Sequence, residues 1–245
     1  MDLGLRDRCG LVTAASKGLG RACAEALIAE GADVYVASRD ARAIEETGTA
    51  IGAAGWSAAD LSQPGEPEAL VDMAVDRLGR LDVLVANAGG PPPGAIEALP
   101  ASSWDEAYNL VLMSAVRLVK AALPFIRRSD QGRIVFITSI SVRQPIPNLV
   151  LSSSLRGAVT GFAKTLSAEL APDGVTVNCL APDAIRTDAL ARLGDMDARA
   201  MSVPMKRLGE ANEVGAACAF LCSRQAGFIT GQSLGIDGGS LLGVH

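Results

Sequence analysis

Short apolar runs alternate with longer amphipathic segments along most of the chain. The apolar runs predict β-strands over residues 9–14, 33–38, 56–60, 81–86, 133–138, 175–180 and 229–236. The amphipathic segments predict helices over residues 18–30, 41–53, 66–78, 102–128, 149–170 and 211–222. Apolar strands separated by helices are typical of a parallel sheet that is covered by helices on both faces.

This pattern predicts one α/β domain of the doubly wound, Rossmann type over residues 1–245. No repeat, linker or low-complexity segment divides the chain, and 245 residues suit one large domain. Hydrophobic residues make up 49% and charged residues 20%, which supports a buried core and argues against disorder. Residues 182–205 lack a clear period, and we expect them to form a loop near the substrate.

Charge and composition exclude several classes of protein. The net charge is −5 and no basic block is present, so a nucleic-acid surface is not expected. No apolar run approaches the roughly 18 residues of a membrane span, and no apolar signal segment opens the chain, so we expect a cytoplasmic protein with no membrane contact. Five cysteines in mostly apolar stretches predict reduced core residues, and the single histidine, His245, leaves a zinc site with almost no support.

A glycine-containing turn follows the first predicted strand directly and leads into the first predicted helix. It reads Thr13-Ala14-Ala15-Ser16-Lys17-Gly18-Leu19-Gly20. Glycines at such a junction let backbone N–H groups approach a phosphate at the helix N-terminus. The alternative is an ordinary turn between a strand and a helix, but the strand–turn–helix context favours phosphate binding.

From this turn onward the chain resembles the short-chain dehydrogenase/reductase family, particularly its 3-oxoacyl-carrier-protein reductases. The resemblance covers the whole chain and rests on the turn above and on four later segments: Asn87-Ala88-Gly89, Pro182-Asp183, Arg207-Leu208-Gly209 and Asp237-Gly238-Gly239. Ala14 and Asp183 stand where the family has glycine. The resemblance implies seven parallel strands, a nicotinamide dinucleotide, a small carbonyl or alcohol substrate, and a homo-oligomer, either a tetramer or a dimer.

The resemblance also places the cofactor. It assigns the dinucleotide to Thr13, Ser16, Lys17, Gly18, Leu19, Gly20, Ser38, Arg39, Asp60, Leu61, Asn87, Ala88, Gly89, Pro182, Ile185 and Thr187. An acidic residue after the second strand would bind the ribose of NAD, but Arg39 stands there, and a guanidinium suits a 2′-phosphate. Lys17 adds a second cation, so we expect NADP(H) to be preferred over NAD(H). Arg39 could instead be a solvated charge, and Asp40 could tolerate NAD.

The family's catalytic residues are largely replaced. Ser139 matches the family serine after the fifth strand. The family tyrosine falls at Ser152, the lysine four residues later falls at Arg156, and the asparagine of the preceding helix falls at Val111. A serine hydroxyl is a far weaker acid than a phenol, although it still donates hydrogen bonds. Arg156 could hold ribose hydroxyls, but it cannot relay protons.

Two other residues are candidates for the missing proton donor. Tyr108 lies one helical turn from Val111, so a phenol from that helix is conceivable, and the alternative is a packed aromatic. Asp183 could donate a proton if burial raised its pKa, and the alternative is a solvated loop carboxylate. Water or the substrate itself could also supply the proton.

Three hypotheses of function remain at this point. The first is an NADP(H)-dependent oxidoreductase that transfers hydride between the cofactor and a carbonyl or secondary alcohol, with Ser139 and Ser152 polarising the substrate oxygen. The second is a catalytically silent dinucleotide-binding homologue or partner subunit. The third is a changed reaction, such as a dehydration or an isomerisation. Fold alone does not decide among them, and we expect an enzyme of the first kind.

Overall fold

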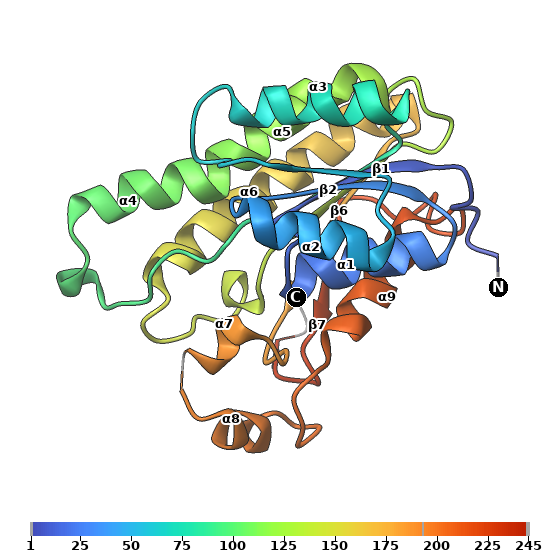
Figure 1. The fold of residues 1–245 in the computed structure, drawn as a ribbon. Coiled ribbons are helices and arrows are strands. Elements are labelled where there is room, and N and C mark those ends of the chain that lie inside the picture. Colours follow the sequence, from blue (N-terminus) through green and yellow to red (C-terminus); the bar gives the residue numbers. More distant parts are fainter. Residues whose placement is uncertain (1, 193, 244–245) are drawn as a thin grey trace.

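The computed structural model describes residues 2–192 and 194–243, which form a seven-stranded parallel sheet between two layers of helices (Figure 1). The strand order is β3-β2-β1-β4-β5-β6-β7, and every pair is parallel. The strands are β1 (Cys9–Thr13), β2 (Asp33–Ser38), β3 (Gly55–Ala58), β4 (Val83–Ala86), β5 (Arg133–Ile137), β6 (Thr176–Pro182) and β7 (Ser233–Ile236). The predicted Rossmann-type, seven-stranded fold is confirmed.

The helices follow the predicted alternation with the strands. They are α1 (Gly18–Ala29), α2 (Ala41–Ile51), α3 (Glu66–Leu78), α4 (Ala101–Ala107), α5 (Ser114–Ile126), α6 (Val150–Leu170), α7 (Asp188–Ala191), α8 (Met196–Ser202) and α9 (Ala211–Cys222). A π-helix, η2 (Tyr108–Met113), joins α4 to α5. Short 3₁₀ turns occur at η1 (Ile96–Ala98), η3 (Ile140–Val142) and η4 (Ala171–Asp173).

The apolar strands have two hydrophobic faces because successive side chains point to opposite sides of a sheet. On β1, Leu11 packs toward α3, α5 and α6, whereas Val12 packs toward α1, α2 and α9. The central strands β4 and β5 alternate in the same way. Figure 1 shows the two helical layers on opposite sides of the sheet. Burial on both faces explains why these strands carry almost no polar residues.

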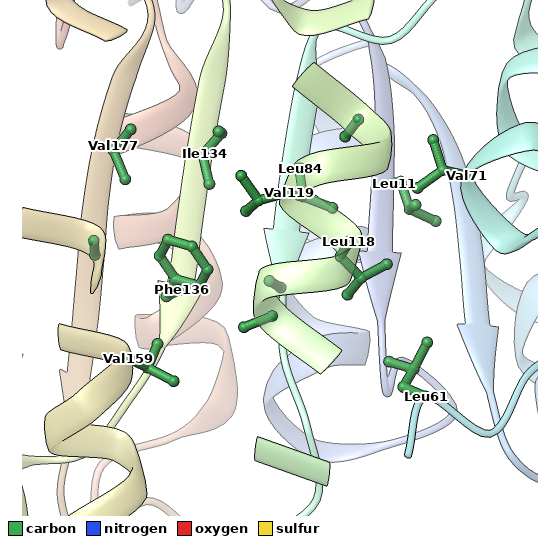
Figure 2. Close-up of a cluster of buried hydrophobic side chains, with 14 of the residues drawn as sticks. Leu11, Leu61, Val71, Leu84, Leu118, Val119, Ile134, Phe136, Val159 and Val177 are labelled. Carbon is green, nitrogen blue, oxygen red and sulfur yellow. The ribbon is translucent and has the colours of Figure 1, made fainter. Parts of the chain in front are cut away.

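One of the two resulting cores is shown in Figure 2, where Phe136 of β5 lies near Val159 of α6, and Leu118 and Val119 of α5 lie beside Leu84 of β4. Phe136 is 1% exposed and meets the ring of Phe162 edge-on, with 6.0 Å between the ring centroids. This core fixes the long helix α6 against the sheet and therefore fixes the residues that α6 carries to the carboxyl edge.

The predicted helix over residues 102–128 is one helical stretch with a π-helical segment in its middle. Here each turn holds an additional residue, so the side chains after it are rotated relative to a regular helix. No glycine, proline or capping residue marks this segment, so the sequence pattern gave no sign of it. Residues 182–205, expected as a loop, contain the short helices α7 and α8.

The stretch Ala101–Ile126 is long and apolar enough to cross a membrane by length and composition, with a mean hydropathy of 1.6. Its residues Leu118, Val119, Ala122 and Ile126 are nevertheless buried against the sheet and its neighbouring helices. Packing within the domain therefore accounts for its apolar inner face.

Helices α1 and α9 approach each other very closely at Gly215. A Cβ atom on Gly215 would lie 2.4 Å from the carbonyl oxygen of Ala22 and 3.3 Å from the Cβ of Ala26. Any side chain here would push α9 away from α1. Because α1 begins at the glycine-containing turn, this contact also helps to hold the turn in place.

We predict that Gly215→Ala lowers the free energy of unfolding by about 1–3 kcal/mol, the usual cost of overpacking. Gly161→Ala is the matched control, because Gly161 is exposed on α6 and has nothing within 4 Å of an added Cβ. That change should raise the free energy of unfolding by about 0.5–1 kcal/mol through helix propensity. Urea denaturation measures both, and equal effects at the two positions would contradict the close helix contact.

Candidate functional site

A cleft of about 810 Å³ opens at the carboxyl ends of the central strands. Parallel sheets of this type place their ligands at this edge, where the strand order reverses. Here β1 lies between β2 and β4, so the loops after β1 and β4 diverge. Many of the residues predicted to bind cofactor line this one cleft: Ser16, Lys17, Gly18, Leu19, Ser38, Arg39, Leu61, Asn87, Ala88, Gly89 and Thr187.

The N-terminus of α1 supplies backbone donors to this cleft. Lys17 is the N-cap residue, no side chain in the described part of the chain caps this helix end, and no acidic residue occurs in the first turn. The first N–H groups of a helix have no partner within it, and the helix dipole favours negative charge there. Together with the cleft volume, these free donors fit the pyrophosphate of a dinucleotide.

Ala14, at the family's glycine position, has a left-handed backbone with φ of 47°. This conformation costs an alanine roughly 1–2 kcal/mol, whereas glycine adopts it freely. The turn tolerates no side chain at Gly20, where a Cβ atom would lie 2.4 Å from the carbonyl oxygen of Ala14. The phosphate turn is therefore compact, with strain stored at Ala14.

Two buried threonines form hydrogen bonds that stabilise the phosphate turn and the neighbouring loop after β4. The Thr13 hydroxyl donates to the carbonyl oxygen of Asn87 at 2.7 Å and accepts from the backbone N–H of Asn87 at 2.9 Å. The Thr47 hydroxyl of α2 donates to the carbonyl oxygen of Ser16 at 2.8 Å. Thr13 thus supports the site without lining the cleft. Thr47 was not predicted, because no sequence motif distinguishes it.

The loop after β2 presents a cation to the cleft. Arg39 is exposed and lines the cleft, whereas the Asp40 carboxylate accepts from the backbone N–H of Ala43 and caps α2. Asp60 accepts hydrogen bonds from the backbone and hydroxyl of Ser62. Burial opposes its ionisation, but these hydrogen bonds and the charge of Arg39 outweigh burial and hold the pKa of Asp60 below its usual value.

Arg156 of α6 reaches the centre of the carboxyl edge and lines the cleft. Its Nη1 donates to the carbonyl oxygen of Ile137 at 2.7 Å, its Nη2 to that of Ala88 at 3.4 Å, and its Nε to the hydroxyl of Ser152 at 3.3 Å. Burial lowers the pKa of Arg156 to about 10, so the side chain stays cationic at neutral pH. No carboxylate in residues 2–192 or 194–243 forms an ion pair with it.

The other predicted catalytic residues are Ser152, four residues before Arg156 on α6, and Ser139, two residues after Ile137. Ser152 is in hydrogen-bond contact with Arg156. Ser139 follows β5 and accepts from the backbone N–H of Ser141 at 3.1 Å, which caps η3. Ser139 and Ser152 do not line the cleft, and neither do Thr13, Gly20, Asp60, Pro182 and Ile185.

Neither residue considered as a replacement acid lines the cleft. Tyr108 is 45% exposed, so the expectation of a packed aromatic is also wrong. Asp183 is buried and forms an ion pair with Arg199 of α8, which contradicts its interpretation as a solvated loop charge. The two candidate proton donors, Tyr108 and Asp183, therefore do not face the cleft in this structure.

Asp188 is a residue of the cleft that was not predicted. Its carboxylate pairs with Lys17 at 3.1 Å and so links α7 to the phosphate turn. Lys17 and Asp188 are both largely exposed, so the pair contributes little stability. No pattern in the sequence connects two residues so far apart in the chain.

This fold, with a free helix N-terminus in a cleft at the strand-order reversal, defines a Rossmann-type dinucleotide-binding domain. The family model described as enoyl-(acyl carrier protein) reductase matches residues 13–240. The chain is 33% identical to the bovine (Bos taurus) dehydrogenase/reductase SDR family member 4, over 97% of the chain and 88% of the relative. It is also 33% identical to the 3-oxoacyl-(acyl-carrier-protein) reductase FabG of Vibrio cholerae, over 97% of the chain and 98% of the relative.

Solved structures agree with these relatives. The L-sorbose reductase of Gluconobacter frateurii, solved with NADPH and L-sorbose, superimposes with a TM-score of 0.94 at 28% identity and 100% coverage of both chains. YwfH, an NADPH-dependent reductase involved in bacilysin biosynthesis, gives a TM-score of 0.92 at 29% identity, covering 97% of this chain and 99% of its own. The chain belongs to the short-chain dehydrogenase/reductase family and is an oxidoreductase.

We predict that Ala14→Gly raises the free energy of unfolding by about 1 kcal/mol, because glycine relieves the left-handed strain. Ala158→Gly is the matched control, because Ala158 is solvent-exposed in the middle of α6. The same change there should lower the free energy of unfolding by about 0.8–1 kcal/mol. Thermal and urea denaturation measure both variants. A loss of stability in Ala14→Gly would show that the turn is not strained at this residue.

Proposed function

We propose that the protein is an NADP(H)-dependent reductase that transfers hydride between this cofactor and a carbonyl or secondary alcohol, similar to 3-oxoacyl-carrier-protein reductases. The observation that carries the proposal is one cleft lined by the phosphate turn, by Lys17 and Arg39, and by Arg156. NADP(H), when bound, supplies the hydride and the two electrons of the reduction. The remaining roles belong to residues of the chain.

Each role follows from the position of the residue. The N-terminus of α1 holds the pyrophosphate, and Arg39 with Lys17 faces the 2′-phosphate. Arg156 has five N–H donors and uses three of them on the chain. The remaining two are free to hold the ribose hydroxyls beside the nicotinamide. Asn87, Ala88 and Gly89 line the cleft near the adenosine ribose. Ser152 and Ser139 are assigned to the substrate oxygen by their match to the family positions, since neither lines the cleft.

The assembly is part of the proposal. We expect a homo-oligomer, a dimer or a tetramer, because large apolar side chains remain exposed on a single chain. Tyr108 is 45% exposed, and Phe228, which lies in the segment between α9 and the edge strand β7, is fully exposed. Contact between copies would remove this apolar surface from water. The cytoplasmic location stays a prediction.

Removing the cation after β2 tests the cofactor preference. Arg39→Gln should weaken NADPH binding about tenfold or more, because a charge-assisted hydrogen bond to the 2′-phosphate is lost. NADH affinity should remain nearly unchanged. Titration by nicotinamide fluorescence measures the dissociation constants of NADPH and NADH. Arg42→Gln is the control, because Arg42 is highly exposed and pairs with Glu46 within α2. An equal loss for both cofactors would contradict the preference.

Restoring the family residues tests whether the site lacks a proton donor. The double variant Ser152→Tyr, Arg156→Lys should raise the rate of NADPH oxidation with saturated ketones by about 10²-fold or more, the usual gain from general acid catalysis. Ser154→Tyr on the exposed side of α6 is the control. If the double variant binds NADPH but gains no ketone reduction, the substitutions do not explain the missing acid.

A further inference from the structure

We propose that Thr47 of α2 is a positioning residue for the cofactor, because its hydroxyl holds the peptide between Ser16 and Lys17 so that the N–H of Lys17 faces the pyrophosphate. This inference rests on the proposed function, since it needs a dinucleotide in the cleft. Thr47 belongs to no motif of the phosphate turn and does not line the cleft. It acts on the cofactor through the turn and does not touch it.

The hydrogen bond of Thr47 joins two segments that lie 31 residues apart in the chain. Its hydroxyl donates to the carbonyl oxygen of Ser16 at 2.8 Å, a normal distance for a bond between two oxygens. The buried face of α2 consists of Ile44, Thr47 and Gly48, of which only Thr47 has a polar side chain. A buried hydroxyl is costly unless it is hydrogen-bonded. The Ser16 carbonyl is therefore the partner that makes a threonine acceptable at this position.

Helix α2 is packed tightly on both sides of Thr47. Ile44 is fully buried in the core that α2 shares with β1, β2 and α1. At Gly48, an added Cβ atom would lie 2.6 Å from the ring of Trp56, so this ring packs directly on the helix backbone. These contacts prevent the helix from rotating about its axis, and they fix the direction in which the Thr47 side chain points.

The geometry of the peptide bond converts this hydrogen bond into a direction for an N–H group. In a planar trans peptide, the C=O of one residue and the N–H of the next point in opposite directions. Ser16 and Lys17 line the cleft, whereas Thr47 does not. Because the Ser16 carbonyl points to Thr47, the N–H of Lys17 points to the opposite side of the turn, toward the cleft.

The N–H of Lys17 is a free donor at the start of α1. It forms no hydrogen bond with any atom of residues 2–192 or 194–243. Lys17 is the N-cap residue, so this N–H lies at the positive end of the helix dipole, where an anionic oxygen is favoured. If the peptide rotated by half a turn, the Ser16 carbonyl would face the pyrophosphate and repel it. The bond to Thr47 opposes this rotation, because rotation would leave a buried hydroxyl without its acceptor.

Thr47→Val tests this role with a side chain of nearly the same shape that has no hydroxyl. ADP-ribose contains the pyrophosphate, whereas adenosine 2′-monophosphate does not. We expect the affinity for ADP-ribose to fall about fivefold or more, the usual effect of leaving a buried carbonyl without its donor. The affinity for adenosine 2′-monophosphate should remain nearly unchanged. Isothermal titration calorimetry of the full chain measures both affinities.

Two control variants separate positioning from general damage. Thr47→Ser keeps the hydroxyl and should restore most of the affinity for ADP-ribose. Thr49→Val makes the same chemical change at an exposed position of α2 and should bind both ligands like the wild type. Circular dichroism verifies that each variant is folded. Equal losses for the two ligands in Thr47→Val, or unchanged binding of ADP-ribose, would overturn the proposal.

A second measurement follows the N–H group itself and needs no nucleotide. Inorganic pyrophosphate is titrated into isotope-labelled protein, and the backbone amide resonance of Lys17 is followed by NMR. We expect the amide proton of Lys17 to move downfield as it donates to the anion, and to move much less in Thr47→Val. A Lys17 resonance that does not respond in the wild type, or that responds equally in Thr47→Val, would overturn the proposed orientation.

The two proposals can fail separately. If inorganic pyrophosphate moves the Lys17 resonance but neither NADPH nor ADP-ribose binds, the proposed cofactor is wrong and the orientation by Thr47 stands. If NADPH and ADP-ribose bind equally well to the wild type and to Thr47→Val, the cofactor proposal stands and the role of Thr47 is wrong.

Discussion

Burial of both faces of the sheet is the constraint on which the rest of the structure depends. Side chains of β1, β4 and β5 pack alternately into the two cores, so neither face is available for a ligand. The carboxyl edge, where loops diverge around β1, holds the large cleft. The same packing fixes α1 through its close contact with α9, and fixes α6 through Phe136 and Val159. The cores therefore position both the phosphate turn and Arg156.

At that edge, one guanidinium joins three segments of the chain. Arg156 bonds to the last residue of β5, to the loop after β4, and to Ser152 on its own helix. A lysine at this position would offer a compact ammonium, whereas the planar guanidinium spans several acceptors at once. Arg156 therefore holds a fixed positive charge at the edge of the cleft and connects the segments that surround it.

Most of the fold could be predicted from the sequence, because hydrophobic period and glycine positions directly reflect burial and chain reversal. The bounds of β2, α3 and α9 agree with the pattern to the residue. The π-helix at Tyr108–Met113 could not be predicted, since its side chains keep a helical period. The pairing of Asp183 with Arg199 and of Lys17 with Asp188 depends on how α7 and α8 fold, and residues 182–205 show no pattern that indicates it. The resemblance also placed Ser152 and Arg156 at catalytic positions four residues apart. Their hydrogen bond, and the lack of a carboxylate paired with Arg156 among the described residues, appear only in the structure.

The most direct measurement is a crystal structure of the full chain with NADP⁺ bound. The account predicts the 2′-phosphate beside Arg39 and the ribose hydroxyls on the two free donors of Arg156. A 2′-phosphate placed away from Arg39, or an Arg156 side chain turned out of the cleft, would contradict it.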